Sequence, residues 1–486
     1  MALHLNDSGL IKTRAYINGE WISSRNSISV RNPCDSSLIA RVAKAGCFEA
    51  QHAIDSAYQA LQPWQAKAAK ERASILRKWF NLIMESQEDL AKILTAEQGK
   101  VLAEARAEIA YGASYVEWFA EEAKRIYGDT IPAPSSDKRV VCIKQPVGVV
   151  ACITPWNFPN AMLTRKIAPA LAAGCTVVCK PASETPLSAL AIAELAHRAG
   201  IPKGVINIVV GNAHEIGRVL TKSPLVRKLT FTGSTEVGKS LVADCSTTLK
   251  KTSMELGGNA PFIVFPDADL KAAISGLMAS KFRNSGQTCV CTNRVLVHEK
   301  IYEEFKQKLT STIKENLVLG HGDREGVTNG PLISQTACET VDRIVQVSLA
   351  KGAKLELGGK PSRLGVCFYP PTVLSDVTND MPAAREEVFG PLVSLIRFTS
   401  EEQAIAIAND TDVGLAAYFY TRDIGRVWRM GEALEYGIVG INEGIISNEM
   451  APFGGIKESG HGREGSKYGL DDYLEIKYMC MGGIDD

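Results

Sequence analysis

An alternation of short apolar runs with helical stretches begins at Pro146 and constrains the fold more than any other feature. The apolar runs are VGVVACI (147–153), CTVVC (175–179), INIVV (206–210), KLTF (228–231) and TSMEL (252–256). Repeated strand–helix–strand units favour a parallel sheet with helices on both faces. We therefore predict an α/β fold that binds its ligands beyond the carboxyl ends of the strands.

One connecting helix has clear boundaries. Thr185 can cap its N-terminus, Pro186 suits its first turn, and Gly200 with Pro202 ends it. Ahead of the alternation, residues 66 to about 127 carry apolar positions at helical spacing and many strong helix formers. This stretch is predicted to be a long helical region.

A second set of alternating elements runs from about Pro261 to about Ser459. It contains the strands VLVHEK, PLVSLIRF, AAYFYTRD and GIVGIN and the helix YEEFKQKLTSTIKEN. Two β-rich segments, RVVCIKQP (139–146) and the tail DYLEIKYMC, lie apart from both sets. Because an unpaired strand edge is a liability, such segments can pair across subunits.

The charge balance gives no reason to expect nucleic acid or a membrane as a partner. Lys+Arg and Asp+Glu both number 54, so the formal net charge is zero. The start, MALHLNDSGLIKTR, lacks the pattern of a signal peptide, and the longest apolar stretch is too short to span a bilayer. The 12 cysteines are scattered, and we expect reduced thiols in the cytoplasm.

The string GSTEVGKS (233–240) matches the phosphate-loop pattern of nucleotide hydrolases. Two features disfavour that interpretation. Glu236 would lie among phosphates, and the strand FIVFPD is interrupted by Pro266 before its only magnesium candidate, Asp267. A different phosphate ligand at the same helix N-terminus remains open, because exposed N–H groups and the helix dipole attract any phosphate.

A cysteine in the stretch FRNSGQTCVCTNR (282–294) is a candidate nucleophile. A nucleophilic Cys289 needs a base, an anion-stabilising group and a pocket. Glu255 in MELGGNAPF and Asn157 in TPWNFP are candidates, since both follow predicted strands. Singly, each residue has an ordinary structural explanation, so a catalytically silent binding protein is a further alternative.

Seven motifs together narrow these alternatives. TPWNFP, KPASETP, FTGSTEVG, MELGGNAP, GQTC, EEVFGP and PFGGIKESG occur in an order and spacing that resemble the aldehyde dehydrogenase superfamily, from about Asn18 onward. The strings TRKIAPALAAGC, GQTCVCTNR, EYGIVGINEGIISNE and DYLEIKYMC are similar to its bacterial succinate-semialdehyde dehydrogenase branch.

The resemblance implies three structural parts. These are a Rossmann-type dinucleotide-binding domain (1–125 and 147–257), an α/β catalytic domain (258–459) and a small β oligomerisation segment (126–146 and 460–486). It also implies a homo-oligomer, either a dimer or a tetramer.

The chemistry implied by the resemblance is covalent. Cys289 attacks the aldehyde, and the Asn157 amide with the Cys289 N–H holds the oxyanion. The thiohemiacetal gives a hydride to the nicotinamide, and Glu255 activates the water that hydrolyses the thioester. The product is a free acid, because the coenzyme-A-acylating branch lacks this base. We expect no metal site.

The cofactor residues carried over from the family are Thr154, Trp156, Asn157, Lys180, Gly211, Gly217, Gly233, Ser234, Leu256, Glu387 and Phe389. Ser234 would meet the pyrophosphate, and Glu387 with Phe389 would hold the nicotinamide ribose. Ser183 stands where many NAD-preferring relatives carry Glu. Because a Ser can donate to a 2′-phosphate that a carboxylate would repel, we expect NADP to be preferred and NAD still used.

Arg165, Arg283 and Ser447 match the family's binders of a distal carboxylate, which suits succinate semialdehyde. Glutarate semialdehyde, one methylene longer, and a broader aldehyde range remain alternatives. In some relatives a Cys289–Cys291 disulfide disarms the nucleophile. Cys291 is therefore a redox candidate, with a small pocket-lining residue as the alternative.

Overall fold

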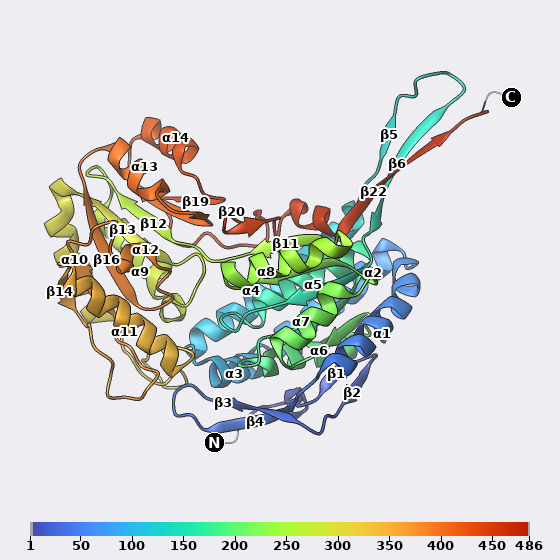
Figure 1. Ribbon diagram of the computed structural model, residues 1–486, viewed down its shortest axis with the longest axis horizontal. Coiled ribbons are helices and arrows are strands. Elements are labelled where there is room, and N and C mark those ends of the chain that lie inside the picture. The colour runs from blue at the N-terminus through green and yellow to red at the C-terminus, as the bar shows by residue number, and fades with distance from the viewer. Residues whose placement is uncertain (1–2, 485–486) are drawn as a thin grey trace.

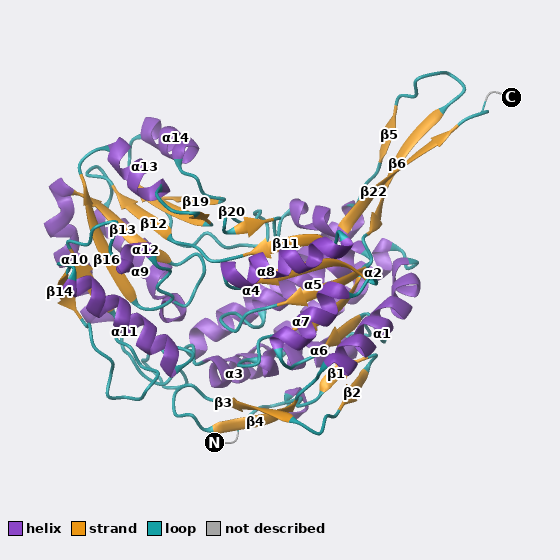
Figure 2. Ribbon diagram, in the orientation of Figure 1, coloured by secondary structure: helices purple, strands orange, loops and turns teal. Residues whose placement is uncertain are grey.

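Two β-sheets, each with helices on both faces, form the body of the molecule, and a narrow β arm projects from it (Figures 1 and 2). The computed structural model describes residues 3–484. The described part of the chain begins at the bottom of the view and ends beside the tip of the arm (Figure 1).

The first sheet has eight strands, and its five central strands are parallel. In spatial order they are β2 (Glu20–Ile22), β1 (Ala15–Ile17), β9 (Ile206–Ile208), β8 (Thr176–Lys180), β7 (Val149–Ile153), β10 (Val226–Thr232), β11 (Lys251–Glu255) and β21 (Gly460–His461). The five strands predicted from the apolar runs are confirmed. The antiparallel edge strands β1, β2 and β21 come from distant segments that the runs did not reveal.

Side chains of this sheet alternate between two helical layers, as the period of a strand requires. Val150 and Cys152 pack with one layer, and Val149 and Ala151 pack with the other. The first layer contains α2 (Ala69–Glu85), α3 (Gln87–Gln98), α4 (Leu102–Glu122), α5 (Ala161–Ala173) and α6 (Pro186–Arg198), and the second contains α1 (Cys47–Gln65), α7 (Ala213–Lys222) and α8 (Thr235–Cys245). Central strands buried on both faces explain their continuous apolar runs.

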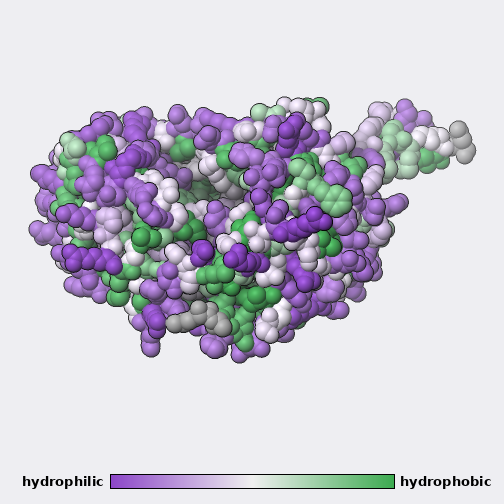
Figure 3. All heavy atoms as spheres, turned by 60° about the horizontal axis from the view of Figure 1, so that its bottom comes forward, coloured by the Kyte–Doolittle hydropathy of each residue, from purple (hydrophilic) through white to green (hydrophobic). Residues whose placement is uncertain are grey.

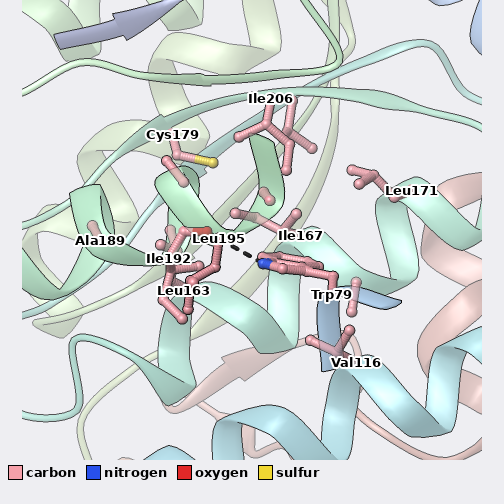
Figure 4. Close-up of a cluster of buried hydrophobic side chains, with 14 of the residues drawn as sticks. Trp79, Val116, Leu163, Ile167, Leu171, Cys179, Ala189, Ile192, Leu195 and Ile206 are labelled. Carbon is pink, nitrogen blue, oxygen red and sulfur yellow. Dashed lines mark hydrogen bonds between the residues drawn. The ribbon is translucent and has the colours of Figure 1, made fainter. Parts of the chain in front are cut away.

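Trp79 of α2 anchors the first layer (Figure 4). Its ring is fully buried beside Val116 of α4 and Ile167 of α5, and its Nε1 donates to the Ile192 carbonyl of α6 at 3.2 Å. A buried indole therefore fills the space between four helices without leaving its N–H unpaired.

Two local expectations need correction. The N-terminus of α6 is capped by the buried carboxylate of Glu97, which accepts from the N–H groups of Leu187 and Ser188 at 2.7 and 2.8 Å, and not by the Thr185 side chain. The predicted long helical region is three helices, with α3 ending at Gly99 in the left-handed conformation. Helix α1 lies outside the predicted elements altogether.

The second sheet has seven strands, in the order β14 (Lys354–Leu357), β15 (Thr372–Ser375), β16 (Leu392–Phe398), β13 (Thr292–His298), β12 (Ala260–Val264), β18 (Ala416–Tyr420) and β19 (Ile438–Ile441). Helices α9 (Leu270–Phe282) and α10 (Tyr302–Asn316) cover one face. Helices α11 (Gln335–Ala350), α12 (Pro382–Arg385), α13 (Glu401–Asn409) and α14 (Ile424–Ala433) cover the other. The predicted strands and the helix of this second set are confirmed, while the domain boundaries stay a prediction.

The arm is a three-stranded antiparallel sheet of β5 (Asp129–Ile131), β6 (Arg139–Pro146) and β22 (Leu474–Met481). A separate hairpin pairs β3 (Ser27–Arg31) with β4 (Leu38–Ala43), and β17 (Val413–Gly414) pairs with β20 (Ile456–Lys457). Apolar side chains of the arm, such as Ile476 at 72 % exposure, face solvent, and the space-filling view shows apolar residues along it (Figure 3). Within residues 3–484, no helix is long and apolar enough to cross a membrane.

Candidate active site

The first sheet reverses its strand order between β7 and β10, because β8 and β9 lie to one side of β7 and β10 and β11 to the other. Such a switch point is where open α/β sheets bind their ligands. The loop after β7 carries Trp156 and Asn157, and the loop after β10 carries Gly233 and Ser234. These loops meet the Cys289 loop of the other sheet around a cavity of about 230 Å³.

Nine of the predicted site residues line this cavity. They are Trp156, Asn157, Gly233, Ser234, Glu255, Leu256, Cys289, Glu387 and Phe389. Tertiary folding thus brings together residues that are up to 233 positions apart in the chain (156 to 389). Pro155, Met162, Thr232 and Gly257 also line it and were not singled out in the sequence.

The nucleophile loop has an unusual backbone. Asn284, Ser285 and Gly286 have φ values of +52°, +54° and +78°. Left-handed conformations are rare for residues other than glycine and are kept only where the surroundings enforce them. A Cβ at Gly286 would lie 2.2 Å from the Gly390 carbonyl oxygen, so only glycine fits the close approach. This turn presents Cys289 to the cavity.

Cys289 is partly exposed and lines the cavity. Burial raises its pKa to about 12, and the carboxylates of Glu387 and Glu255 act in the same direction. The guanidinium groups of Arg165 and Arg283 oppose the rise in this pKa. The group therefore rests as a thiol, and the nearby cations favour its thiolate.

Asn157 supplies a hydrogen-bond donor in the lining of the same cavity. Its Nδ2 donates one N–H to the Gln287 carbonyl at 3.1 Å, which leaves the second N–H for another acceptor. Within residues 3–484 the backbone N–H of Cys289 has no hydrogen-bond partner. Two residues of the cavity lining, Asn157 and Cys289, therefore each have an N–H group available to an acceptor, and an oxyanion needs donors of this kind.

Glu255 ends β11 and is 4 % exposed. Burial raises the pKa of its carboxyl well above the usual range, the Glu464 carboxylate adds to this, and Arg165, Lys166 and Arg463 oppose it. Its Oε2 has no hydrogen-bond partner in the described residues. An unpaired, high-pKa carboxyl on a cavity wall can exchange a proton with bound water.

The two glycines after Glu255 allow three chain segments to meet. A Cβ at Gly257 would lie 2.6 Å from Glu387 Oε2, and one at Gly258 would lie 2.8 Å from the Cys289 carbonyl oxygen. The N–H of Gly258 donates to Glu387 Oε1 at 3.2 Å. The two glycines of the motif MELGG are therefore needed because the Glu387 side chain and the Cys289 backbone pass too close to them for a Cβ.

Phe389 and Trp156 lie next to each other in the cavity lining. Their rings meet edge to face with centroids 5.6 Å apart. Phe389 has φ +49°, which is strained for a bulky residue, and strain of this kind concentrates at ligand sites.

The remaining predicted cofactor residues line up along the carboxyl edge of the first sheet. Lys180 is 5 % exposed and donates to the Pro181 carbonyl at 3.2 Å, and the Ser183 hydroxyl donates to the Gly211 carbonyl at 3.3 Å. Gly217 is a buried residue of α7, where a Cβ would find no atom within 4 Å.

Two buried hydroxyls support a ligand along this edge. Thr154 Oγ1 and Thr232 Oγ1 have no hydrogen-bond partner in the described residues. Buried polar atoms are rarely left unpaired, so these groups fit a ligand with polar phosphates and riboses. The residues present are thus suited to a dinucleotide.

The GSTEVGKS string opens α8, as its pattern predicts. Ser234 is the N-cap, and its side chain accepts from the N–H of Val237. Lys239 points away to an exposed ion pair with Glu458 at 2.6 Å, so it does not serve a phosphate at the cavity. Gly238 makes room for Leu256, whose Cδ2 would lie 2.5 Å from a Cβ there.

The two arginines differ in their surroundings. Arg165 of α5 is buried, with Nη2 2.5 Å from Glu464 Oε2 and its guanidinium 4.2 Å from the Phe453 ring centroid. Its Nε makes no hydrogen bond within the described residues. Arg283 stacks on Phe158 at 5.2 Å and has no ion-pair partner in residues 3–484. Ser447 lies half-buried in the loop after β19.

Cys291 is buried, and its Sγ donates to the carbonyls of Lys281 and Thr292 at 3.4 Å. All cysteines of the chain are free thiols. The Cys291 N–H bonds to the Thr288 carbonyl at 3.0 Å, which makes a tight turn across Cys289. The redox role of Cys291 stays a prediction.

Glu464 is the main charged residue that the motifs did not reveal. It pairs with Lys166 Nζ as well as with Arg165, both at 2.5 Å. Burial raises the pKa of its carboxyl, but the two cations outweigh burial and lower it. The only sequence signal was the adjacent pair Arg165–Lys166 in a helix that is otherwise apolar, since two buried cations need a counter-charge.

A thiol, two amide-type donors and a buried carboxyl at the switch point of a doubly wound sheet define a cysteine-dependent α/β enzyme with a dinucleotide crevice. Residues 21–479 match the Aldehyde dehydrogenase family. The chain belongs to the aldehyde dehydrogenase family, and it is an aldehyde dehydrogenase.

Three curated relatives are similar along the whole chain. The succinate-semialdehyde dehydrogenase [NADP(+)] GabD of Escherichia coli (strain K12) is 59 % identical, covering 99 % of this chain and 100 % of the relative. A 3-sulfolactaldehyde dehydrogenase of Pseudomonas putida (58 %) and a glutarate-semialdehyde dehydrogenase of Pseudomonas aeruginosa (57 %) match with the same coverage. A crystal structure described as an E. coli NADP dependent enzyme superposes with a TM-score of 0.98 at 59 % identity, over 99 % of this chain and 100 % of that chain.

Proposed function

We propose that this aldehyde dehydrogenase oxidises succinate semialdehyde to succinate with NADP as the preferred cofactor and NAD as a second one. The observation that carries the proposal is the pair Arg165 and Arg283, both close enough to Cys289 to lower its pKa. Two guanidinium groups within reach of the reacting thiol suit an aldehyde that carries an anionic group at its far end. The relatives named for short acidic aldehydes support this substrate class.

The reaction follows from the positions of four groups. Arg165 and Arg283 bind the distal carboxylate and favour the Cys289 thiolate, which attacks the aldehyde carbon. The Asn157 amide and the Cys289 N–H hold the oxygen of the tetrahedral thiohemiacetal. A nicotinamide dinucleotide held at the carboxyl edge of the first sheet would supply the hydride acceptor, and loss of the hydride converts the thiohemiacetal on Cys289 into a thioester. Glu255 then takes a proton from the water that hydrolyses this thioester and frees succinate.

Ser183 supports the preference for NADP. Its hydroxyl donates to the Gly211 carbonyl at the edge where the adenosine ribose would bind, and residue 183 itself carries no carboxylate. We expect kcat/KM with NADP to exceed that with NAD. In the Ser183→Glu variant the order should reverse, because a carboxylate repels a 2′-phosphate and accepts from ribose hydroxyls. Steady-state kinetics with both cofactors test this, and a parent enzyme that uses NAD equally well would refute it.

Arg283 allows the cleanest test of the substrate, because no residue of the described range 3–484 forms an ion pair with it, whereas Arg165 also neutralises Glu464. Arg283→Ala should raise KM for succinate semialdehyde by about tenfold or more, as a charge-assisted bond is worth roughly 1.5–3 kcal/mol. KM for propanal, which has no carboxylate, should change little. Equal losses on both aldehydes would contradict the assignment, and a lower KM for glutarate semialdehyde in the parent would favour that alternative.

The arm supports a homo-oligomer. Ile131, Ile476 and Met481 on it are exposed apolar side chains, and a second copy of the chain would cover them. Sedimentation of the purified protein tests this inference, which a monomer at micromolar concentration would contradict. The cytoplasmic location stays a prediction.

A further inference from the structure

A buried charged cluster that the proposed reaction does not use lies behind the active-site loops. Lys100 precedes α4, and Glu104 and Glu108 stand one turn apart on it. Lys100 and Glu108 are paired at 2.5 Å, with both side chains at 0 % exposure. A buried ion pair brings little net stability by itself, so the groups that this pair contacts indicate its role.

The cluster contacts the backbone of the Asn157 loop. Lys100 Nζ donates to the Asn157 carbonyl at 2.8 Å. Glu108 Oε1 accepts from the N–H groups of Asn160 and Ala161 at 3.0 and 3.2 Å. The same ion pair therefore holds the peptide that carries the Asn157 amide and the first turn of α5.

The cluster also contacts the nucleophile loop of the other sheet. Glu104 Oε1 accepts from the N–H of Asn284 at 2.9 Å, where the strained turn begins. Asn284 Nδ2 donates to the carbonyls of Asn157 and Gln287 at 3.1 and 3.2 Å. The Asn157 side chain donates to that same Gln287 carbonyl. Three charged side chains from one segment thus tie two loops from different sheets into one network.

We propose that Lys100, Glu104 and Glu108 are positioning residues that set the Asn157 amide relative to Cys289, and so build the oxyanion site. This inference rests on the proposed role of Asn157. Displacement of a reacting group by about 1 Å can cost on the order of 100-fold in rate, so a fixed network between the two loops has a direct catalytic consequence.

The first test separates oxyanion chemistry from simple thiol access. Lys100→Met should slow hydride transfer by about 10–100-fold in a rapid-mixing burst, with KM within about threefold. Alkylation of Cys289 by iodoacetamide should change less than about threefold, because displacement of iodide builds no oxyanion. Hydride transfer within threefold of the parent, or alkylation that falls in parallel with it, would overturn the proposal.

Matched variants control for folding and charge. Glu88→Gln breaks the exposed Glu88–Arg106 pair between α3 and α4 and should leave both rates unchanged. Glu104→Gln keeps an acceptor for the Asn284 N–H, so its rate of hydride transfer should be about tenfold higher than that of Glu104→Leu. Equal rates in the two variants would contradict a positioning role for Glu104. If Lys100→Met is insoluble, the uncharged pair Lys100→Met/Glu108→Gln takes its place with the same expectations.

A double-mutant cycle connects the cluster to its target. In an Asn157→Ala background, Lys100→Met should cost no more than about a further threefold, because the amide that it positions is gone. Fully additive losses would refute action through Asn157. If Asn157→Ala alone leaves the rate of hydride transfer unchanged, both the oxyanion role of Asn157 and the positioning role of the cluster are refuted. If Asn157→Ala slows hydride transfer and Lys100→Met does not, only the positioning role of the cluster is refuted.

Discussion

Replacing Cys289 with serine should abolish aldehyde oxidation, with kcat lowered by at least about 1000-fold. The hydroxyl of serine is far less acidic than a thiol, and burial at this position already raises the pKa of the thiol to about 12. The Arg165 and Arg283 cations that favour a thiolate cannot produce an alkoxide at neutral pH. Formation of reduced nicotinamide, followed by its absorbance, is the measurement.

The matched control is Cys47→Ser, which changes an exposed thiol on α1 outside the cavity and should retain full activity. Cofactor affinity should be retained in Cys289→Ser, because none of the predicted phosphate contacts involve the thiol. Substantial turnover by Cys289→Ser would reject the covalent mechanism, whereas lost cofactor binding would show that the substitution had disturbed the site as a whole.

Glu255→Gln should divide the reaction into its two halves. Glutamine fills the same space but cannot accept a proton, so hydride transfer should proceed once and the thioester should then persist. Rapid mixing should show a burst of one reduced cofactor per active site, followed by turnover lowered by about 100-fold or more. Hydroxylamine, which attacks a thioester without a base, should restore turnover.

The pH dependence of the parent enzyme follows from the same carboxyl. Burial raises the pKa of Glu255 well above its usual range, so the protonated, inactive base persists to higher pH. Hydrolysis needs the deprotonated form, and kcat should therefore rise as pH increases through that raised pKa. This rise of kcat with pH should be absent in Glu255→Gln. It should remain in Glu236→Gln, a control substitution at the surface of α8. A Glu255→Gln enzyme that turns over steadily without a burst would contradict the assignment of Glu255 as the base that activates water.

Much of the fold could be predicted because the relevant signals are local. Apolar runs of strand length, turn residues and helical spacing located the central strands of both sheets. Since the carboxyl ends of parallel strands meet at one edge, Asn157, Glu255 and the Gly233–Ser234 turn were expected to lie together, and the cavity contains all of them. Motifs in register with a known family then associated Cys289 with them.

Other features had no local signal. The cap of α6 comes from Glu97, about ninety residues earlier, and a capping Thr185 was the natural expectation from sequence. Glu464 lies 298 residues from Lys166, and Lys100 lies 57 residues from Asn157. No periodicity or spacing rule relates such partners, because they become neighbours only when the sheets pack.

The sequence by itself determined the order of strands and helices, the turns that end them and the chemical groups at their ends. The tertiary structure alone decided which of those groups share one cavity, how far each is buried and which charges face it. Desolvation and charge set the pKa values of Cys289 and Glu255 and the pairing of Arg165. These effects depend on distances through space, which a linear pattern does not contain.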